Sequence, residues 1–87
     1  MPRLLIKPKA QKQIARLGNR IIEKILSALA RLEADPGDPS LDITQLRGKK
    51  LPGFRLRIGD YRLLYTIEDG TIEIYLCGHR KDVYKIS

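Results

Sequence analysis

Apolar residues occupy every second position in two neighbouring segments of the chain, residues 54–58 and 61–65. A period of two is typical of β-strands that bury one face and expose the other. The residues between the segments, Gly59-Asp60, suit a type II′ hairpin turn, because glycine tolerates the positive φ at the first position of that turn. The pattern therefore predicts a hairpin in which Arg57 lies directly opposite Arg62.

A second hairpin is predicted around Asp69-Gly70, a pair that strongly favours a type I′ turn. The register of a two-residue loop there places Leu63 opposite Leu76 and Arg62 opposite Cys77. The two hairpins then agree, with apolar side chains on one face of the sheet. The side chains expected on the other face are Arg55, Arg57, Arg62, Tyr75, Cys77 and His79.

Two amphipathic helices are predicted before the hairpins. Residues 3–7 suit a short first strand, and Pro8 can begin a helix because its missing N–H is harmless in the first turn. We expect Gly18 to end that helix in a left-handed conformation and Asn19 to cap the second helix. The second helix carries a broad apolar stripe and should stop at about Ala34, before an Asp-Pro pair.

Residues 35–50 contain two prolines and two glycines and are expected to form a connection, with room for a short helical turn. Together the elements predict an α+β fold, in which an N-terminal strand and a two-helix hairpin pack on one face of an antiparallel β-sheet. We expect a single domain over residues 1–87, because a chain of this size buries only about 60% of the surface that its unfolded form exposes.

The charge balance narrows the class of partner. The chain has 17 Lys and Arg residues against 10 Asp and Glu residues, a formal net charge of +7, so an anionic partner is expected. Nucleic acid and an anionic membrane surface both qualify. No apolar run approaches the roughly 18 residues that span a bilayer, and the first residues lack the features of a secretory signal.

Cysteine and histidine usage does not favour metal chemistry. The chain has one cysteine, Cys77, and one histidine, His79. One thiol cannot form an internal disulfide, and the two residues by themselves cannot complete a structural zinc site. We therefore expect a protein of the reducing cytoplasm with no metal and no cofactor, in which Cys77 is a small strand residue rather than a nucleophile.

The arginines of the predicted hairpin indicate an anion-binding face. Like charges directly opposite each other destabilise an antiparallel pair by up to about 1 kcal/mol, so a polyanion across Arg57 and Arg62 would turn a cost into attraction. The alternative is an ordinary solvated strand face. Further basic residues lie near the hairpins, at Arg47, Lys49, Lys50, Arg80 and Lys81. They extend the positive face, or they form flexible basic segments without a role.

If the anion is RNA, its phosphodiester can be cleaved without a metal. The ribose 2′-hydroxyl attacks the adjacent phosphorus, which requires a base, groups that offset charge on the phosphate oxygens, and an acid for the leaving 5′ oxygen. Arginine suits the second task, because its planar, charged fork matches two phosphate oxygens. A pKa above about 12 makes it a poor base, whereas the imidazole of His79 can titrate near neutrality.

Four motifs resemble those of a known toxin family. They are LRG at residues 46–48, FRLRIGDYRLLY at 54–65, EDG at 68–70 and GHRKDVY at 78–84. With the predicted order of elements, they resemble the RelE branch of the RelE/ParE toxin superfamily over nearly the whole chain. The resemblance implies a RelE-like, microbial-ribonuclease-like fold and a metal-independent endoribonuclease that cuts mRNA in the ribosomal A site.

The resemblance also implies roles for particular residues. It assigns Arg62 and Arg80 to stabilising the phosphate and the transition state, and Tyr84 to stacking on a base or orienting the 2′-hydroxyl. Arg55 and Arg57 lie where well-known members carry lysines that bind the RNA backbone, one of them proposed as the general base. The residues expected to contact RNA are Arg55, Lys49, Lys50, Arg47 and Lys81.

The arginine at position 57 departs from the family pattern. Arg57 can still bind phosphate, but a base role would require an unusually depressed pKa, so His79 is the second candidate for proton transfer. The partners implied are a RelB-like antitoxin, in a toxin–antitoxin hetero-oligomer, and the ribosome with its mRNA and 16S rRNA. No membrane partner is implied.

Three other functions fit parts of the sequence. The ParE branch shares the scaffold but poisons DNA gyrase, and the presence of Arg62, Arg80 and Tyr84 favours the RelE branch over it. A non-catalytic RNA-binding module would need the same positive face, with more aromatic residues on it than Tyr75 and Tyr84. The third is a toxin reduced to an antitoxin-binding partner.

Overall fold

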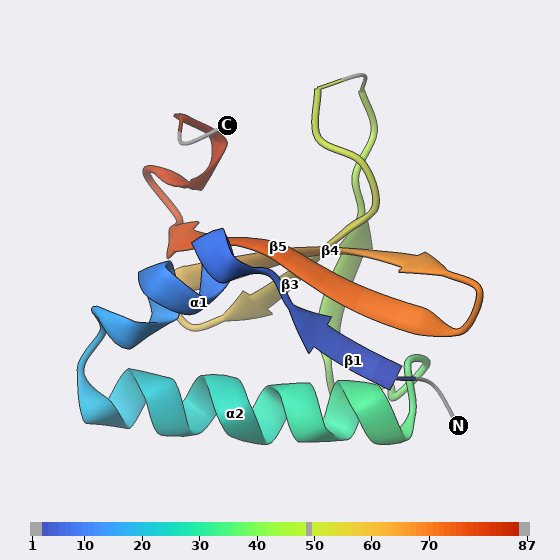
Figure 1. Ribbon diagram of the computed structural model, residues 1–87, viewed down its shortest axis with the longest axis horizontal. Helices are drawn as coiled ribbons and strands as arrows, with labels where there is room; N and C mark the ends of the chain where they lie inside the picture. Colours follow the sequence, from blue (N-terminus) through green and yellow to red (C-terminus); the bar gives the residue numbers. More distant parts are fainter. Residues whose placement is uncertain (1–2, 49, 86–87) are drawn as a thin grey trace.

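In the computed structural model, which describes residues 3–48 and 50–85, five strands form one sheet and two helices pack against it (Figure 1). The strands follow the order β1-β5-β4-β3-β2 across the sheet. Their bounds are β1 (Arg3–Ile6), β2 (Asp42–Gln45), β3 (Phe54–Ile58), β4 (Tyr61–Glu68) and β5 (Thr71–His79). The helices are α1 (Pro8–Ala15), α2 (Asn19–Ala34) and the short 3-10 helix η1 (Val83–Lys85). Within the described ranges, no helix is long and apolar enough to cross a membrane.

The main core lies between the helices and one face of the sheet. The long helix α2 runs across this face (Figure 1), and its buried residues recur at helical spacing. Apolar side chains of α1 and of the central strands meet them. The fully buried members of this core include Ala10, Ile25, Leu32, Leu63, Ile72 and Ile74. The predicted α+β architecture, with both helices against one face of a sheet, is confirmed.

The β3–β4 hairpin has the predicted register. Arg57 pairs with Arg62 and Leu56 with Leu63, and Gly59 takes a φ of 58°, which suits the first position of a type II′ turn. Leu56 and Leu63 are buried on the helix side of the sheet. Because side chains alternate along a strand, Arg57 and Arg62 stand on the face away from α2.

The β4–β5 pairing departs from the prediction halfway along the strands. The turn itself is as predicted, with φ angles of 50° at Asp69 and 76° at Gly70. Tyr65 pairs with Ile74, but the preceding residue of β4, Leu64, pairs with Leu76. The residue between Ile74 and Leu76 in β5, Tyr75, is therefore an extra one, and the strand contains a β-bulge.

The bulge reverses the facing of the end of β5. Leu76, expected in the main core, lies on the face away from the helices, whereas Cys77, expected on that outer side, is buried in the main core. The predicted pairs of Leu63 with Leu76 and Arg62 with Cys77 are wrong, since Leu63 pairs with Cys77 and Arg62 with Gly78. One inserted residue has this effect because side chains alternate with a period of two.

The first strand, β1, pairs in parallel with β5, so the sheet is mixed rather than purely antiparallel. The pairing ends where the Lys7 N–H donates to the Ile74 carbonyl at 2.8 Å. Beyond that point α1 covers the edge of β5, and the side-chain oxygen of Gln13 accepts a hydrogen bond from the Cys77 N–H at 2.8 Å. A helix side chain thus satisfies a strand donor that β1 does not reach.

Two further local features differ from the prediction. Gly18 has a φ of −69° and is itself the N-cap residue of α2, so it is not left-handed and Asn19 is the first helical residue rather than the cap. An extended N-cap joins the two helices without a left-handed residue. Residues 42–45 form strand β2 beside β3 instead of part of a loop. The end of α2 at Ala34 is as predicted.

The backbone at Gly53 passes so close to β4 that no larger residue fits there without a shift. Gly53 has a φ of 92°, and a Cβ there would collide with the carbonyl oxygen of Tyr65, whereas Gly70, with a φ of 76°, has open space around it. A positive φ alone costs a non-glycine residue roughly 1–3 kcal/mol. We expect Gly70→Ala to lower the free energy of unfolding by an amount within that range, and Gly53→Ala to lower it by more, as measured by urea unfolding. Equal decreases in the two variants would show that the collision at Gly53 is relieved at no cost.

The buried Cys77 and Tyr65 predict a loss of stability in alkali. Burial raises the pKa of the Cys77 thiol from 9.0 to about 11 and that of Tyr65 to about 12. Above about pH 9 the unfolded chain releases protons that the folded chain keeps, so the free energy of unfolding falls as the pH rises. We expect Cys77→Ala to make this decline shallower between about pH 9 and pH 11. An identical decline in both proteins would assign it to other groups.

Candidate nucleic-acid interface

The face of the sheet away from α2, called the outer face below, carries an apolar cluster beside its arginines. Leu64 and Leu76 are buried there with Val83 of η1, which is 0% exposed. Leu46 and Leu51, from the loop between β2 and β3, pack against them. The loop and the C-terminal segment both rise from this face (Figure 1). The apolar cluster therefore holds the β2–β3 loop and the C-terminal segment next to the arginines.

Arg55 of β3 is held by two hydroxyl groups. Its Nη1 donates to the Tyr84 hydroxyl at 3.2 Å, and its Nη2 donates to Thr44 Oγ1 at 3.3 Å. Its Nε is buried without a hydrogen-bond partner. Thr44 is the cross-strand neighbour on β2 and Tyr84 belongs to η1. One guanidinium group thus links two strands to the C-terminal segment.

Arg62 of β4 is held against the hairpin turn. Its Nη1 donates to the carbonyl oxygens of Gly59 at 2.8 Å and Tyr61 at 2.9 Å. Its cross-strand neighbour on β5 is Gly78, which has no side chain to cover it. Two backbone acceptors restrict the rotamers of Arg62, so its charge has a defined position before any ligand binds.

The positively charged side chains of the outer face are close enough to affect the pKa of Arg62. Burial is the main cause that lowers the pKa of the Arg62 guanidinium. Three neighbouring positive charges lower this pKa further, in the order Arg57, Arg55 and Arg80, while Tyr84 raises it. Coulomb interactions weaken with distance. Four guanidinium groups and one phenol therefore share one region of the outer face.

Arg57 and Arg80 each have a carboxylate nearby. Arg57 Nη1 lies 3.9 Å from Asp42 Oδ2, and Arg80 Nε lies 3.8 Å from Asp60 Oδ1. Both separations exceed the roughly 2.7–2.9 Å of a charge-assisted hydrogen bond, and all four side chains are more than half exposed. Exposed pairs of this kind are worth roughly 0–1 kcal/mol. The carboxylates offset some repulsion, and an incoming phosphate can displace them at little cost.

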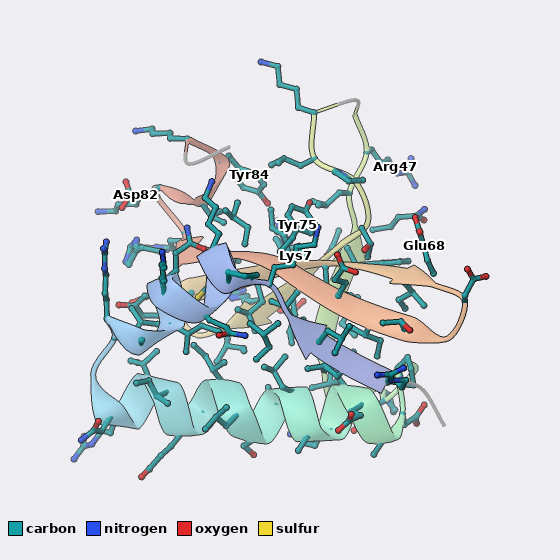
Figure 2. All side chains as sticks on the ribbon, viewed as in Figure 1. Lys7, Arg47, Glu68, Tyr75, Asp82 and Tyr84 are labelled. Carbon is teal, nitrogen blue, oxygen red and sulfur yellow. The ribbon has the colours of Figure 1, made fainter. Side chains whose placement is uncertain are left out.

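The segment after β5 brings Arg80 and Tyr84 back toward the sheet. The Arg80 N–H donates to the Asp60 carbonyl at 2.7 Å, which ties the segment to the β3–β4 turn. Tyr84 is 46% exposed, and Figure 2 shows its side chain directed from the C-terminal segment toward the region of Tyr75. Burial, followed by the nearby Tyr84, raises the pKa of Tyr75. A partly exposed phenol thus stands beside the arginines.

His79 does not lie on the arginine face. It pairs with Tyr61 at the end of β5, with ring centroids 5.6 Å apart, on the helix side of the sheet. Its Nδ1 accepts a hydrogen bond from the Lys81 N–H at 3.2 Å. The predicted facing of His79 is wrong, because the bulge at Tyr75 moves each later residue of β5 to the opposite face.

The other basic residues border the arginines. Arg47 lies on the loop that projects from the outer face (Figure 2), and Lys50, on the same loop, is exposed. Lys81 is exposed at the start of the C-terminal segment. Lys49 lies outside the described residues. These positions widen the positive surface without adding to the group around Arg62.

Several side chains that organise this region were not expected from the sequence. Thr44 holds Arg55, and Asp42 lies near Arg57, because residues 42–45 form a strand that was taken as a loop. The hydroxyl of Tyr75 donates to the Pro52 carbonyl at 2.7 Å and holds the projecting loop. Among the described residues, no three His, Cys, Asp or Glu side chains gather as a metal site requires.

The chain is a member of a class of small toxins from type II toxin–antitoxin systems, as comparison of its sequence with known protein families shows. The sequence profile of the family described as "ParE toxin of type II toxin-antitoxin system, parDE" matches residues 4–84. The chain therefore belongs to this ParE toxin family, within the RelE/ParE toxin superfamily that its motifs resemble. Among curated proteins, none matches the chain.

Solved structures of RelE proteins share the fold. A chain of the RelB-RelE antitoxin–toxin complex from Methanococcus jannaschii matches with a TM-score of 0.78 and 22% identity, over 94% of this chain and 96% of that chain. A chain of the toxin–antitoxin complex RelBE2 from Mycobacterium tuberculosis matches with a TM-score of 0.74 and 30% identity, over 92% and 100%. The isolated RelE toxin of E. coli matches with a TM-score of 0.71 and 19% identity, over 100% of both chains.

Proposed function

We propose that this toxin is an endoribonuclease that cleaves mRNA in the ribosomal A site, without a metal ion, and thereby inhibits translation. The observation that carries the proposal is the gathering of four arginines and Tyr84 in one region of the outer face. Arg57 pairs with Arg62 across the hairpin, Arg55 contacts Tyr84, and the backbone of Arg80 is tied to the β3–β4 turn. Guanidinium groups bind pairs of phosphate oxygens, and a tyrosine ring stacks on a base. The net charge of +7 adds a field that attracts RNA.

The proposed reaction is an attack by the ribose 2′ oxygen on the adjacent phosphorus. A bond forms between these atoms as the bond to the 5′ oxygen breaks, the 2′ proton passes to a base, and the 5′ oxygen receives a proton from an acid. Negative charge grows on the non-bridging oxygens, where Arg62 and Arg80 stabilise it. Arg62 suits this role because its backbone hydrogen bonds fix it in advance, so little reorganisation is needed.

The remaining roles follow from charge and exposure. Arg57 is more than half exposed and binds the phosphate, because a guanidinium group remains protonated and serves poorly as a base. Tyr84 stacks on a base or orients the 2′-hydroxyl. No step is assigned to His79, whose ring packs beside Tyr61 on the helix side of the sheet. The residues proposed to contact flanking RNA are Arg47, Lys49, Lys50 and Lys81. The guanidinium group of Arg55 is instead engaged by Thr44 and Tyr84.

The proposal includes two macromolecular partners. Similar structures were solved as RelB-RelE complexes, and we propose that a RelB-like antitoxin holds this toxin inactive in a hetero-oligomer. The positive charge of the toxin favours an acidic antitoxin surface. The ribosome presents the mRNA, and the basic residues around the outer face contact 16S rRNA.

A second candidate function is inhibition of DNA gyrase, as in the ParE branch. The observation that favours it is the matching family profile, which is described as a ParE toxin. The two functions leave different products in the cell. A ribonuclease leaves severed mRNA, whereas a gyrase poison leaves intact mRNA and stalled gyrase–DNA complexes.

Induction of the toxin in growing cells separates these functions. For the ribonuclease we expect growth arrest together with new mRNA ends at codon positions inside translated regions, because cleavage takes place in the A site. Sequencing of RNA ends and immunoprecipitation of gyrase–DNA adducts measure the two products. Intact mRNA with accumulated adducts would overturn the ribonuclease proposal in favour of the second candidate.

Replacement of Arg62 tests the proposed stabilisation of the transition state. We expect Arg62→Ala to lower the cleavage rate by about 10²–10³-fold, the usual loss when one donor to a developing oxyanion is removed. The fold and antitoxin binding should persist, because Arg62 points away from the main core. The matched control is Arg3→Ala, which removes an exposed arginine at the start of β1 and should cleave normally. A folded Arg62→Ala variant with undiminished cleavage would refute the assignment.

A further inference from the structure

The contact between Arg55 and Tyr84 has a defined direction. A guanidinium group has donors and no acceptor, so Arg55 Nη1 is the donor across the 3.2 Å contact and the Tyr84 hydroxyl oxygen is the acceptor. The phenolic hydrogen of Tyr84 therefore points away from Arg55. The contact fixes both the position of the Tyr84 oxygen and the side from which its own hydrogen can be donated.

Arg55 is itself restrained by β2 and by burial. Its Nη2 donates to Thr44 Oγ1 at 3.3 Å, and its Nε is buried without a partner. Both Thr44 and Leu64 are its cross-strand neighbours, one on each side. Arg57 and Arg80, in contrast, have side chains that are more than half exposed. Among these arginines, Arg55 has the fewest donors ready for a phosphate.

Tyr84 needs such a restraint. It belongs to a 3-10 helix of three residues, Val83–Lys85, and a single turn of this kind is a weak structure by itself. The preceding residue, Val83, is fully buried and anchors the backbone. That anchor holds the backbone and does not by itself set the side-chain torsions of Tyr84. The hydrogen bond from Arg55 acts at the phenol end of the side chain and restrains its orientation there.

We propose that Arg55 is a positioning residue, which holds the phenol of Tyr84 toward the substrate through a Thr44–Arg55–Tyr84 chain of hydrogen bonds, rather than a phosphate ligand. The effect on cleavage rests on the proposed ribonuclease function. The hydrogen-bond chain does not, because it is a property of the free toxin.

Positioning and phosphate binding make different demands on residue 55. A phosphate ligand acts through its charge, so Arg55→Lys would retain most of its effect. A positioning residue must reach Thr44 and Tyr84 at once, which a single ammonium group cannot do in the geometry of a planar fork. We therefore expect Arg55→Lys to behave like Arg55→Met, and Thr44→Val, which removes no charge, to act in the same direction.

The first part of the test measures the orientation of the Tyr84 ring by NMR and does not require RNA cleavage. NMR spectra of the full chain with labelled tyrosine are recorded, and the Tyr84 ring signals are assigned with Tyr84→Phe. We expect Arg55→Met and Thr44→Val to shift these signals, and Arg3→Met, the matched loss of an exposed arginine on β1, to leave them in place. An unchanged Tyr84 signal in Arg55→Met would overturn the proposal, whether or not the protein cleaves RNA.

The second arm is a double-mutant cycle for mRNA cleavage on ribosomes. We expect Arg55→Met to lower kcat about tenfold with KM changed less than about twofold, and to cause less than about a twofold further loss in the Tyr84→Phe background. Additive losses, or a raised KM with a salt dependence reduced by about one phosphate contact, would instead identify Arg55 as an independent phosphate ligand. Absence of cleavage by the unaltered toxin would count against the ribonuclease function alone, and the NMR result would then decide the positioning role.

Discussion

Both faces of the sheet depend on one extra residue in β5. The bulge at Tyr75 lets a single strand supply Cys77 to the core under the helices and Leu76 to the apolar cluster on the outer face. That cluster buries Val83, and Val83 brings the C-terminal segment to rest beside the arginines. Without the bulge, Tyr84 would lose its anchor. β-Bulges often redirect side chains next to functional sites. Here the bulge lets the C-terminal segment pack on the outer face.

The outer face concentrates positive charge without burying ion pairs. The four arginines are accommodated in three ways: backbone carbonyls hold Arg62, hydroxyl groups hold Arg55, and exposed carboxylates lie near Arg57 and Arg80. A close, buried ion pair would be expensive to break when a phosphate arrives. Neutral acceptors and exposed carboxylates avoid that cost. The face therefore stays positive in the folded, unliganded toxin, and its ligand does not have to compete with strong internal partners.

The parts of the fold that could be predicted are those encoded by local signals. The register around Arg57 and Arg62 follows from a glycine-led turn between two alternating segments, and it is correct to the residue. The bulge could not be predicted in this way, because residues 74–77 are all apolar enough to be buried and alternation among them carries no register. The wrong facing of His79 followed from this one error.

The candidate site was predictable as a set of residues but not as a network. Motifs identify Arg62, Arg80 and Tyr84, and the structure brings them to one region with Arg55. The role of Thr44 depends on β2, a four-residue strand whose only apolar member is Ile43. Such a strand gives almost no periodic signal, and it forms because β3 offers an edge to pair with. Contacts that depend on a non-local pairing are not visible in a linear pattern.

One face of the sheet forms the main core and the other carries the arginines. This separation explains why relatives with different names match the same chain. The profile described as a ParE toxin extends over residues 4–84, and RelE structures superpose over nearly the whole chain. Both comparisons are governed by the helices, the strands and their common core. The proposed chemistry involves a few side chains on the outer face, away from the main core, and one scaffold can host different functions. The two candidate functions therefore have to be separated by experiments on the outer face, at its arginines and Tyr84, since the shared core is compatible with both.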